Sequence, residues 1–169
     1  MFVLGIDPGL TRCGYGLVTK GESSATFAAA AAGTIETDPA DAAEKRLFEL
    51  GAALRSLLVE YRPDVVVVER IFFQTNARTA TGVAQASGVA LASAVEHGCA
   101  VAQYTSNEVK LAVVGYGAAT KHQVQTMVAR QVGLTEVPSP DAADALALAV
   151  CHLVGASLRD AVRRAEARR

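Results

Sequence analysis

The chain lacks the features that mark secreted and membrane proteins. It has no apolar run near the roughly 20 residues that a membrane helix needs. It also has no basic stretch followed by an apolar stretch, the pattern of a signal peptide. Its three cysteines, Cys13, Cys99 and Cys151, are far apart and form no Cys-x-x-Cys pair. Such a pattern is typical of free thiols, so we expect a cytoplasmic protein with no membrane partner.

Two common ligand-binding motifs are also missing. No Gly-x-x-x-x-Gly-Lys-Ser/Thr loop is present, which excludes the usual P-loop nucleotide site. No His/Cys spacing suggests zinc. We therefore interpret His97, His122 and His152 as surface or packing residues.

The length of 169 residues predicts one domain with a sizeable core. We expect residues 1–155 to form that domain and residues 156–169 to be a basic, flexible tail. The tail has five arginines against two acids, and the rest of the chain has 11 basic and 15 acidic residues, a net charge of −4. We interpret the tail as a solvated, frayed helix end, with weak phosphate binding as the alternative.

The first candidate functional residue, Asp7, lies at the end of the opening apolar stretch. Residues 2–6 are apolar and rich in β-formers, so they predict a buried strand that runs into Asp7. A carboxylate at the edge of a core is costly unless a cation meets it. Gly14 and Gly16 follow and allow another chain segment or a ligand to pass close. Taken alone, Asp7 is explained slightly better by capping its own turn, and only the three further acids described below reverse that balance.

The pattern recurs at residues 65–69. Four valines without alternation predict a strand buried on both faces, and this strand ends in Glu69. Before it lies an amphipathic helix, for which we expect Asp38 as N-cap and Pro39 in the first turn. A helix that leads into a doubly buried strand implies a right-handed crossover to a parallel neighbour. The natural neighbour is the first strand, which would place Asp7 beside Glu69.

The other segments complete an α/β fold. We expect strands at 14–20, 25–37 and 99–104, and helices at 77–97, at 121–132 and from Pro140. We also expect Ser106 to cap a short helix that includes Lys110. The result is a mixed five-stranded sheet, three antiparallel strands followed by parallel ones, flanked by helices. Small residues on one face of the 77–97 helix permit close packing within the chain or across a two-fold dimer axis (Ala80, Ala84, Gly88 and Ala92).

The last helix supplies two more acids. Ser139 is its expected N-cap, and Asp141 falls in the first turn, where the helix dipole favours negative charge. Asp144 lies three residues on and projects from the same face. Carboxylates gathered together repel one another unless cations compensate. Mg²⁺ suits oxygen ligands, and two such ions can hold both the attacking water and the leaving oxygen of a phosphodiester cleavage. The constellation of Asp7, Glu69, Asp141 and Asp144 therefore predicts metal-assisted hydrolysis.

Cationic and aromatic residues join this set. Lys110 and Lys121 can hold a substrate phosphate or the departing charge, although solvated helix lysines explain them equally well. Two adjacent aromatics follow Glu69. We expect Phe72 to be exposed for stacking and Phe73 to lie in the core.

These residues together resemble the RuvC family of Holliday-junction resolvases, which have the ribonuclease-H-like fold. The resemblance covers about the first 155 residues. Its strongest pieces, in order, are Gly5-Ile6-Asp7-Pro8-Gly9 with Gly14-Tyr15-Gly16, Glu69-Arg70-Ile71-Phe72, Asn76 with Gln85-Ala86-Ser87-Gly88-Val89-Ala90, Val109-Lys110 with Val114-Gly115-Tyr116-Gly117, Lys121-His122-Gln123-Val124-Gln125, and Asp141-Ala142-Ala143-Asp144-Ala145-Leu146-Ala147. Some family members have His in place of Asp141.

The resemblance implies a homodimer that binds four-way DNA junctions and nicks two strands, leaving 5′-phosphate and 3′-hydroxyl ends. The four acids would bind Mg²⁺ or Mn²⁺, two ions per site during catalysis. Lys110 and Lys121 would contact phosphate near the cut, and Phe72 would stack on a base with Arg70 and Arg78 also binding substrate. RuvA and RuvB would be its partner proteins.

Three alternatives stay open. Residues 7–11 also resemble the first phosphate loop of actin-like sugar kinases and ATPases, but that fold needs two lobes. A related nuclease could act on RNA or on other branched DNA. A non-catalytic DNA-binding scaffold could keep the fold without the chemistry, although none of the four acids is missing.

Overall fold

The protein, seen here as a computed structural model, is described for residues 1–20, 26–70 and 77–166. Its elements are β1 Phe2–Asp7, β2 Arg12–Lys20, β3 Phe27–Glu36, α1 Ala43–Tyr61, β4 Val65–Glu69, α2 Ala77–Glu96, β5 Ala100–Tyr104, α3 Ser106–Val114, α4 Lys121–Gln131 and α5 Pro140–Glu166. The strands form a sheet in the order β3-β2-β1-β4-β5. The pairs β1–β2 and β2–β3 are antiparallel, whereas β1–β4 and β4–β5 are parallel. The predicted mixed sheet, including the parallel pairing of β1 with β4, is confirmed.

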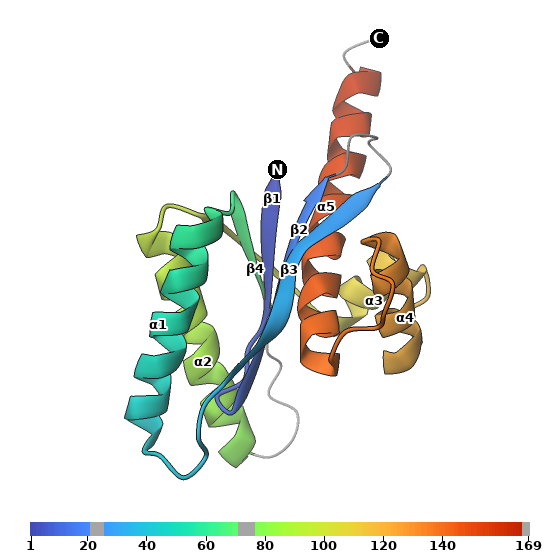
Figure 1. Ribbon diagram of the computed structural model, residues 1–169. Coiled ribbons are helices and arrows are strands. Elements are labelled where there is room, and N and C mark those ends of the chain that lie inside the picture. Colours follow the sequence, from blue (N-terminus) through green and yellow to red (C-terminus); the bar gives the residue numbers. More distant parts are fainter. Residues whose placement is uncertain (21–25, 71–76, 167–169) are drawn as a thin grey trace.

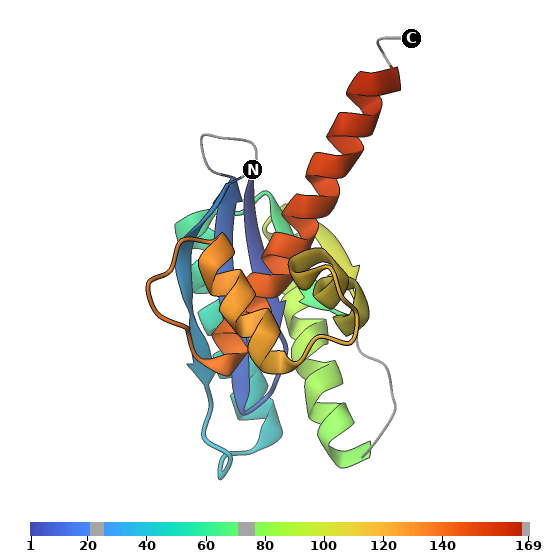
Figure 2. The same ribbon diagram turned by 90° about the vertical axis from the view of Figure 1, so that its right-hand side faces the viewer.

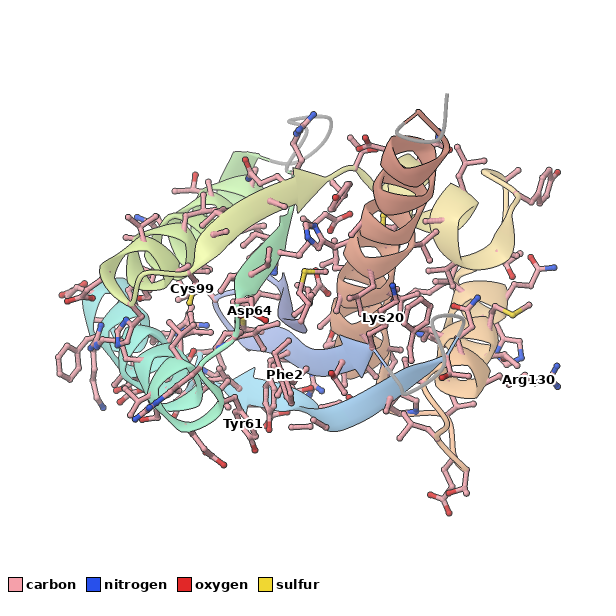
Figure 3. All side chains as sticks on the ribbon, turned by 90° about the horizontal axis from the view of Figure 1, so that it is seen from above. Phe2, Lys20, Tyr61, Asp64, Cys99 and Arg130 are labelled. Carbon is pink, nitrogen blue, oxygen red and sulfur yellow. The ribbon has the colours of Figure 1, made fainter. Side chains whose placement is uncertain are left out.

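Helices cover both faces of this sheet. The helices α1 and α2 lie on one face, and α5 lies on the other, with α3 and α4 beside it (Figure 1). Side chains fill the space on each side of the sheet (Figure 3). Leu4 and Ile6 of β1 belong to the core under α1 and α2, whereas Val3 belongs to the core under α5. The sheet is therefore the middle layer between two separate cores.

Strand alternation decides which face the first two acids occupy. Val3 of β1 and Val67 of β4 face α5, and successive side chains of a strand point to opposite faces. Asp7 and Glu69 consequently project toward α5. The register pairs Gly5 with Val67, so the two acids end neighbouring strands at the same edge.

Glycines let α5 pack directly on the strands. A Cβ atom at Gly5 would lie 1.9 Å from the carbonyl oxygen of Ala145, and one at Gly14 would lie 2.0 Å from that of Asp141. Such distances are far inside van der Waals contact, so no other residue fits without moving the helix. The segment that was expected to pass close to Gly14 is thus the first turn of α5.

Two predicted helix caps are wrong. The helix α1 begins at Ala43, and its N-cap residue Ala42 makes no side-chain cap bond. Asp38 instead accepts a hydrogen bond from the backbone of Ala40 at 2.8 Å. This local turn, which includes Pro39, satisfies Asp38 before the helix starts. At α3 the N-cap is Thr105, one residue before Ser106, and it forms a capping box with Glu108.

The last helix extends beyond the body of the protein. α5 continues to Glu166, and its carboxyl-terminal end projects away from the sheet (Figure 2). The segment 156–166 is therefore helical, and the flexibility of the basic tail stays a prediction. In the described part of the chain, no helix has both the length and the apolar character to span a membrane.

Candidate active site

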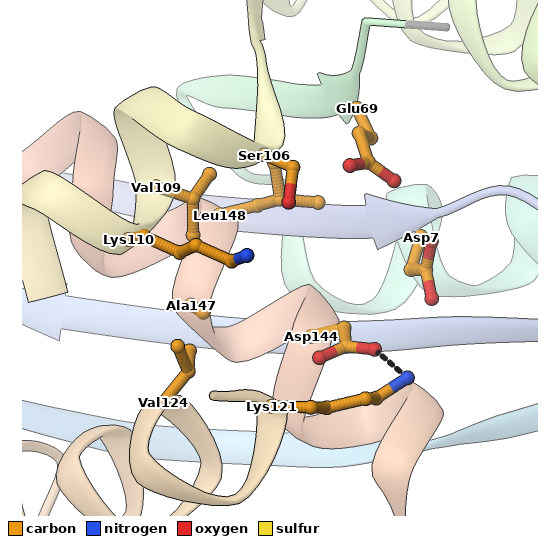
Figure 4. Close-up of a pocket in the computed structure, with 10 residues that line it drawn as sticks. All are labelled: Asp7, Glu69, Ser106, Val109, Lys110, Lys121, Val124, Asp144, Ala147 and Leu148. Carbon is orange, nitrogen blue, oxygen red and sulfur yellow. Dashed lines mark ion pairs between the residues drawn. The ribbon is translucent and has the colours of Figure 1, made fainter. Parts of the chain in front are cut away.

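A pocket of about 350 Å³ lies at the carboxyl ends of β1 and β4. Its lining residues are Asp7, Glu69, Ser106, Val109, Lys110, Lys121, Val124, Asp144, Ala147 and Leu148. Three carboxylates from three elements point toward this space, and two lysines approach it from α3 and α4 (Figure 4). The structure thus brings together five of the residues predicted from the sequence, namely Asp7, Glu69, Asp144, Lys110 and Lys121.

Asp7 is the carboxylate most perturbed by this environment. Burial first, and then the negative charges of Glu69 and Asp144, together raise its pKa from 3.8 to about 7, while Lys121 opposes the shift. The pKa of Glu69 is also raised, by burial first and then by Asp144. These shifts mean that the pocket holds more negative charge than it can stabilise without a cation.

Lys121 supplies part of the missing positive charge. Its Nζ donates to Oδ2 of Asp144 at 2.6 Å. This bond raises the pKa of the Lys121 ammonium, so the group stays charged. Thr120 caps α4 through a capping box with Gln123 and thereby fixes the position of Lys121 in the first turn. Lys110 also lines the pocket, and it forms no ion pair with the acids of the described segments.

Asp141 is placed differently from the other three acids. Its Oδ2 accepts a hydrogen bond from Nε of Arg12 at 2.7 Å, and Arg12 also donates from Nη1 to Oε1 of Glu36. Asp141 is not among the residues that line the pocket, although its charge contributes to the raised pKa of Asp7. The first turn of α5 therefore holds one acid in the pocket, Asp144, and one acid beside it.

The donor set suits a hard divalent cation, although the side chains are not arranged around one. Within residues 1–20, 26–70 and 77–166, no three His, Cys, Asp or Glu side chains are grouped as metal ligands. Two of the four carboxylates are instead occupied by side-chain cations, Asp144 by Lys121 and Asp141 by Arg12. The carboxylate oxygens of the site are the kind of donor that hard divalent cations prefer in proteins.

The loop that follows Asp7 is held by hydrogen bonds on its other side. Thr37 is buried, and its hydroxyl donates to the carbonyl oxygen of Leu10 at 2.6 Å. Arg46 of α1 donates from Nε to that same hydroxyl at 2.9 Å and from Nη2 to the hydroxyl of Thr11 at 2.6 Å. These bonds fix the turn between β1 and β2, so both Asp7 and Arg12 stand on an anchored segment.

Most of the predicted substrate-binding side chains lie outside the part of the chain that the structure describes. Phe72 and Phe73 lie outside the described residues. Arg78 is in the first turn of α2, and its side chain is also outside the description. Arg70 is exposed at the end of β4, where its backbone N–H donates to Tyr104 at 2.8 Å and its guanidinium to the carbonyl oxygen of Gln103 at 3.4 Å.

Sequence reasoning missed two residues at the site. Ser106 was interpreted as a helix cap, but it lines the pocket. Arg12 was given no role, although it binds Asp141, which is 129 positions away. The position of Arg12 between Asp7 and Gly14 was a usable signal for the site, but nothing in the sequence indicated its partner.

The sheet order, the helix packed across β1 and the acids at the strand ends define the class of protein as ribonuclease-H-like. The profile of one family within that class, described as crossover junction endodeoxyribonuclease RuvC, matches residues 3–152. The chain belongs to the RuvC family.

Named relatives agree with this assignment. The chain is 52% identical over 153 residues to crossover junction endodeoxyribonuclease RuvC of Leifsonia xyli, covering 89% of this chain and 72% of that one. It is 46% identical over 169 residues to RuvC of Saccharopolyspora erythraea, covering 99% and 84%. A solved structure of Thermus thermophilus RuvC in complex with Holliday junction substrate matches with a TM-score of 0.87 at 36% identity, covering 94% and 96%. The match to the second relative includes the basic tail.

Proposed function

We propose that this protein is an endonuclease that resolves four-way DNA junctions by metal-dependent hydrolysis of phosphodiester bonds. The observation that carries this proposal is the pocket in which Asp7, Glu69 and Asp144 meet Lys110 and Lys121. Membership in the RuvC family and the likeness to a relative solved with Holliday junction substrate support the choice of DNA. The products would carry 5′-phosphate and 3′-hydroxyl ends.

We propose Mg²⁺ as the cofactor, with Mn²⁺ able to replace it and two ions present during catalysis. Asp7, Glu69, Asp141 and Asp144 would hold the ions. When bound, they would activate the attacking water and stabilise the leaving oxygen. The support is the raised pKa of Asp7, whose burial beside other carboxylates makes its ionised form unfavourable until a cation arrives.

The residues of the chain would then divide the remaining work. Lys110, which lines the pocket and pairs with none of the described acids, would bind a phosphate there. Lys121 would leave Asp144 and turn to the phosphate as the cation replaces it. Phe72 would stack on a base beside the opened crossover, with Arg70 and Arg78 binding the backbone.

A homodimer would place two such sites on one junction, and the outer face of α2 is our proposed contact. Gly88 and Ala92 on this face are exposed, and a Cβ atom at Gly88 would meet nothing within 4 Å. The described part of the monomer thus leaves this small-residue face open. Replacing Gly88 by Leu should convert a dimer to monomers in sedimentation velocity, and an unchanged sedimentation coefficient would argue against this contact.

We also propose RuvA and RuvB as partner proteins and the cytoplasm as the location. Membership in the RuvC family supports the choice of partners. The location is supported by three free cysteines, Cys13, Cys99 and Cys151, two of which are buried.

A cleavage gel tests the proposed function directly. The protein is incubated with mobile and immobile four-way junctions, linear duplex and RNA, each with Mg²⁺ and with chelator. We expect paired nicks in the junctions with Mg²⁺ only, and binding that weakens as salt rises. Asp7→Asn should abolish cutting while junction binding persists. Cutting of RNA or linear duplex at a similar rate would favour a nuclease of different specificity, and binding without any cutting would favour a scaffold.

A further inference from the structure

Arg12 connects two elements at the edge of the proposed metal site. It begins β2, and its guanidinium bridges Asp141 at the start of α5 and Glu36 at the end of β3. Half of the Arg12 side chain is exposed, compared with a quarter of Asp141. The bridge is thus a specific contact at the rim of the site, between residues that the sequence separates widely.

The bridge decides where the Asp141 carboxylate points. The main chain of Asp141 is fixed, because its carbonyl oxygen lies against Gly14 with no space even for a Cβ atom. Only the side-chain torsions can move the carboxylate between Arg12 and the pocket. In the structure, Asp144 lines the pocket and Asp141 binds Arg12.

We propose that Arg12 is a positioning residue that competes with a divalent cation for the Asp141 carboxylate and so lowers the affinity of the site for metal. This inference rests on the proposed metal-dependent function. With Oδ2 bound to Arg12, Asp141 does not line the pocket, so we expect rotation of its carboxylate inward toward an ion to break the pair. Removing Arg12 would leave Asp141 free to turn inward.

A Mn²⁺ titration without DNA tests the competition. Free Mn²⁺ is measured by electron paramagnetic resonance for the wild type, Arg12→Gln, Asp141→Asn and the double variant. An exposed ion pair is weak, so we expect Arg12→Gln to bind Mn²⁺ about two- to fivefold more tightly. Arg12→Lys keeps the charge but loses the fork that reaches both acids, so its affinity should lie between those of the wild type and Arg12→Gln.

The double variant separates competition for Asp141 from general electrostatics. Loss of one positive charge near an acidic pocket also attracts cations, but that effect does not need Asp141. If Arg12 acts through Asp141, at least half of the tightening must vanish in the Asp141→Asn background. Tightening that persists in that background overturns the proposal, as does equal or weaker binding by Arg12→Gln.

One further outcome concerns the site itself. A wild-type protein that binds no Mn²⁺ would refute the proposed metal site, and with it the role of Arg12. Tight binding by the wild type with no gain in Arg12→Gln would refute only the role of Arg12. Urea unfolding of each variant with chelator confirms that the compared proteins are folded.

Discussion

Replacing Asp7 by Asn should make the metal-free protein more stable. In the folded state burial and the neighbouring acids raise the pKa of Asp7 from 3.8 to about 7. The folded protein therefore holds this proton more tightly than the unfolded chain does. The contribution of Asp7 to the free energy of unfolding is therefore most favourable below about pH 4. It falls as pH rises from about 4 to about 7 and is constant above that range.

The magnitude follows from the same values. Each pKa unit is worth about 1.4 kcal/mol, so ionised Asp7 costs up to about 4 kcal/mol at pH 8. Asparagine has the same shape without the charge. We expect Asp7→Asn to raise the free energy of unfolding by about 2–4 kcal/mol at pH 8 with chelator, and by less than half as much at pH 5.

Urea unfolding at pH 5 and pH 8, with chelator and then with Mg²⁺, measures these differences. Mg²⁺ should stabilise the wild type more than Asp7→Asn, because the ion meets the charge that the variant lacks. Glu136→Gln is a matched control, since Glu136 is exposed and does not line the pocket, and it should change stability by less than about 0.5 kcal/mol. Asp7→Asn that is no more stable than the wild type at pH 8 with chelator would refute the electrostatic argument.

Three further predictions test residues that position the acids of the site or influence their charge. Gly14→Ala should push the first turn of α5 away from β2, lower the free energy of unfolding by about 1–3 kcal/mol and abolish cleavage. Gly82→Ala is the control and should be tolerated, because a Cβ atom there meets Leu10 at an ordinary 3.5 Å. Equal effects of the two variants in unfolding and cleavage assays would contradict this prediction. Thr37→Val should cost about 1–3 kcal/mol in urea unfolding, because it removes the hydrogen bonds of the Thr37 hydroxyl to the carbonyl oxygen of Leu10 and to Nε of Arg46. Thr37→Ser should restore most of the loss. Lys121→Met should raise the pKa of Asp7 further, because the charge of Lys121 lowers that pKa. Carboxyl ¹³C NMR measures the pKa of Asp7, which the control Lys45→Met should leave unchanged.

The arrangement of β1 and β4 was predictable because each rule involved was local or topological. A run of four valines requires burial on both faces, and a helix between two parallel strands requires a right-handed crossover. These two facts place Asp7 and Glu69 at the ends of neighbouring strands. The glycines of β2 likewise indicated a close approach, although the sequence did not show that α5 makes it.

The errors arose where several local solutions compete. Asp38 and Pro39 suit a helix start, but they suit a tight turn equally well, and the structure has the turn there, with α1 beginning only at Ala43. The orientation of Asp141 depends on Arg12, a partner that no spacing rule finds across 129 positions. Helical spacing correctly places Asp141 and Asp144 on one face, but it does not determine which charge each carboxylate meets.

Three acids in and beside the pocket are neutralised in three different ways. Asp7 retains a proton near neutral pH, Asp144 binds the ammonium of Lys121, and Asp141 binds the guanidinium of Arg12. Under the proposed metal-dependent function, a divalent cation at this site would displace a proton from Asp7 and the two side-chain cations. Because only the proton depends on pH in the physiological range, metal affinity should rise as pH increases toward about 7 and level off above it. The displaced side chains, Arg12 and Lys121, would then lie beside the pocket, no longer paired with Asp141 and Asp144, and they could bind the phosphates of a DNA backbone.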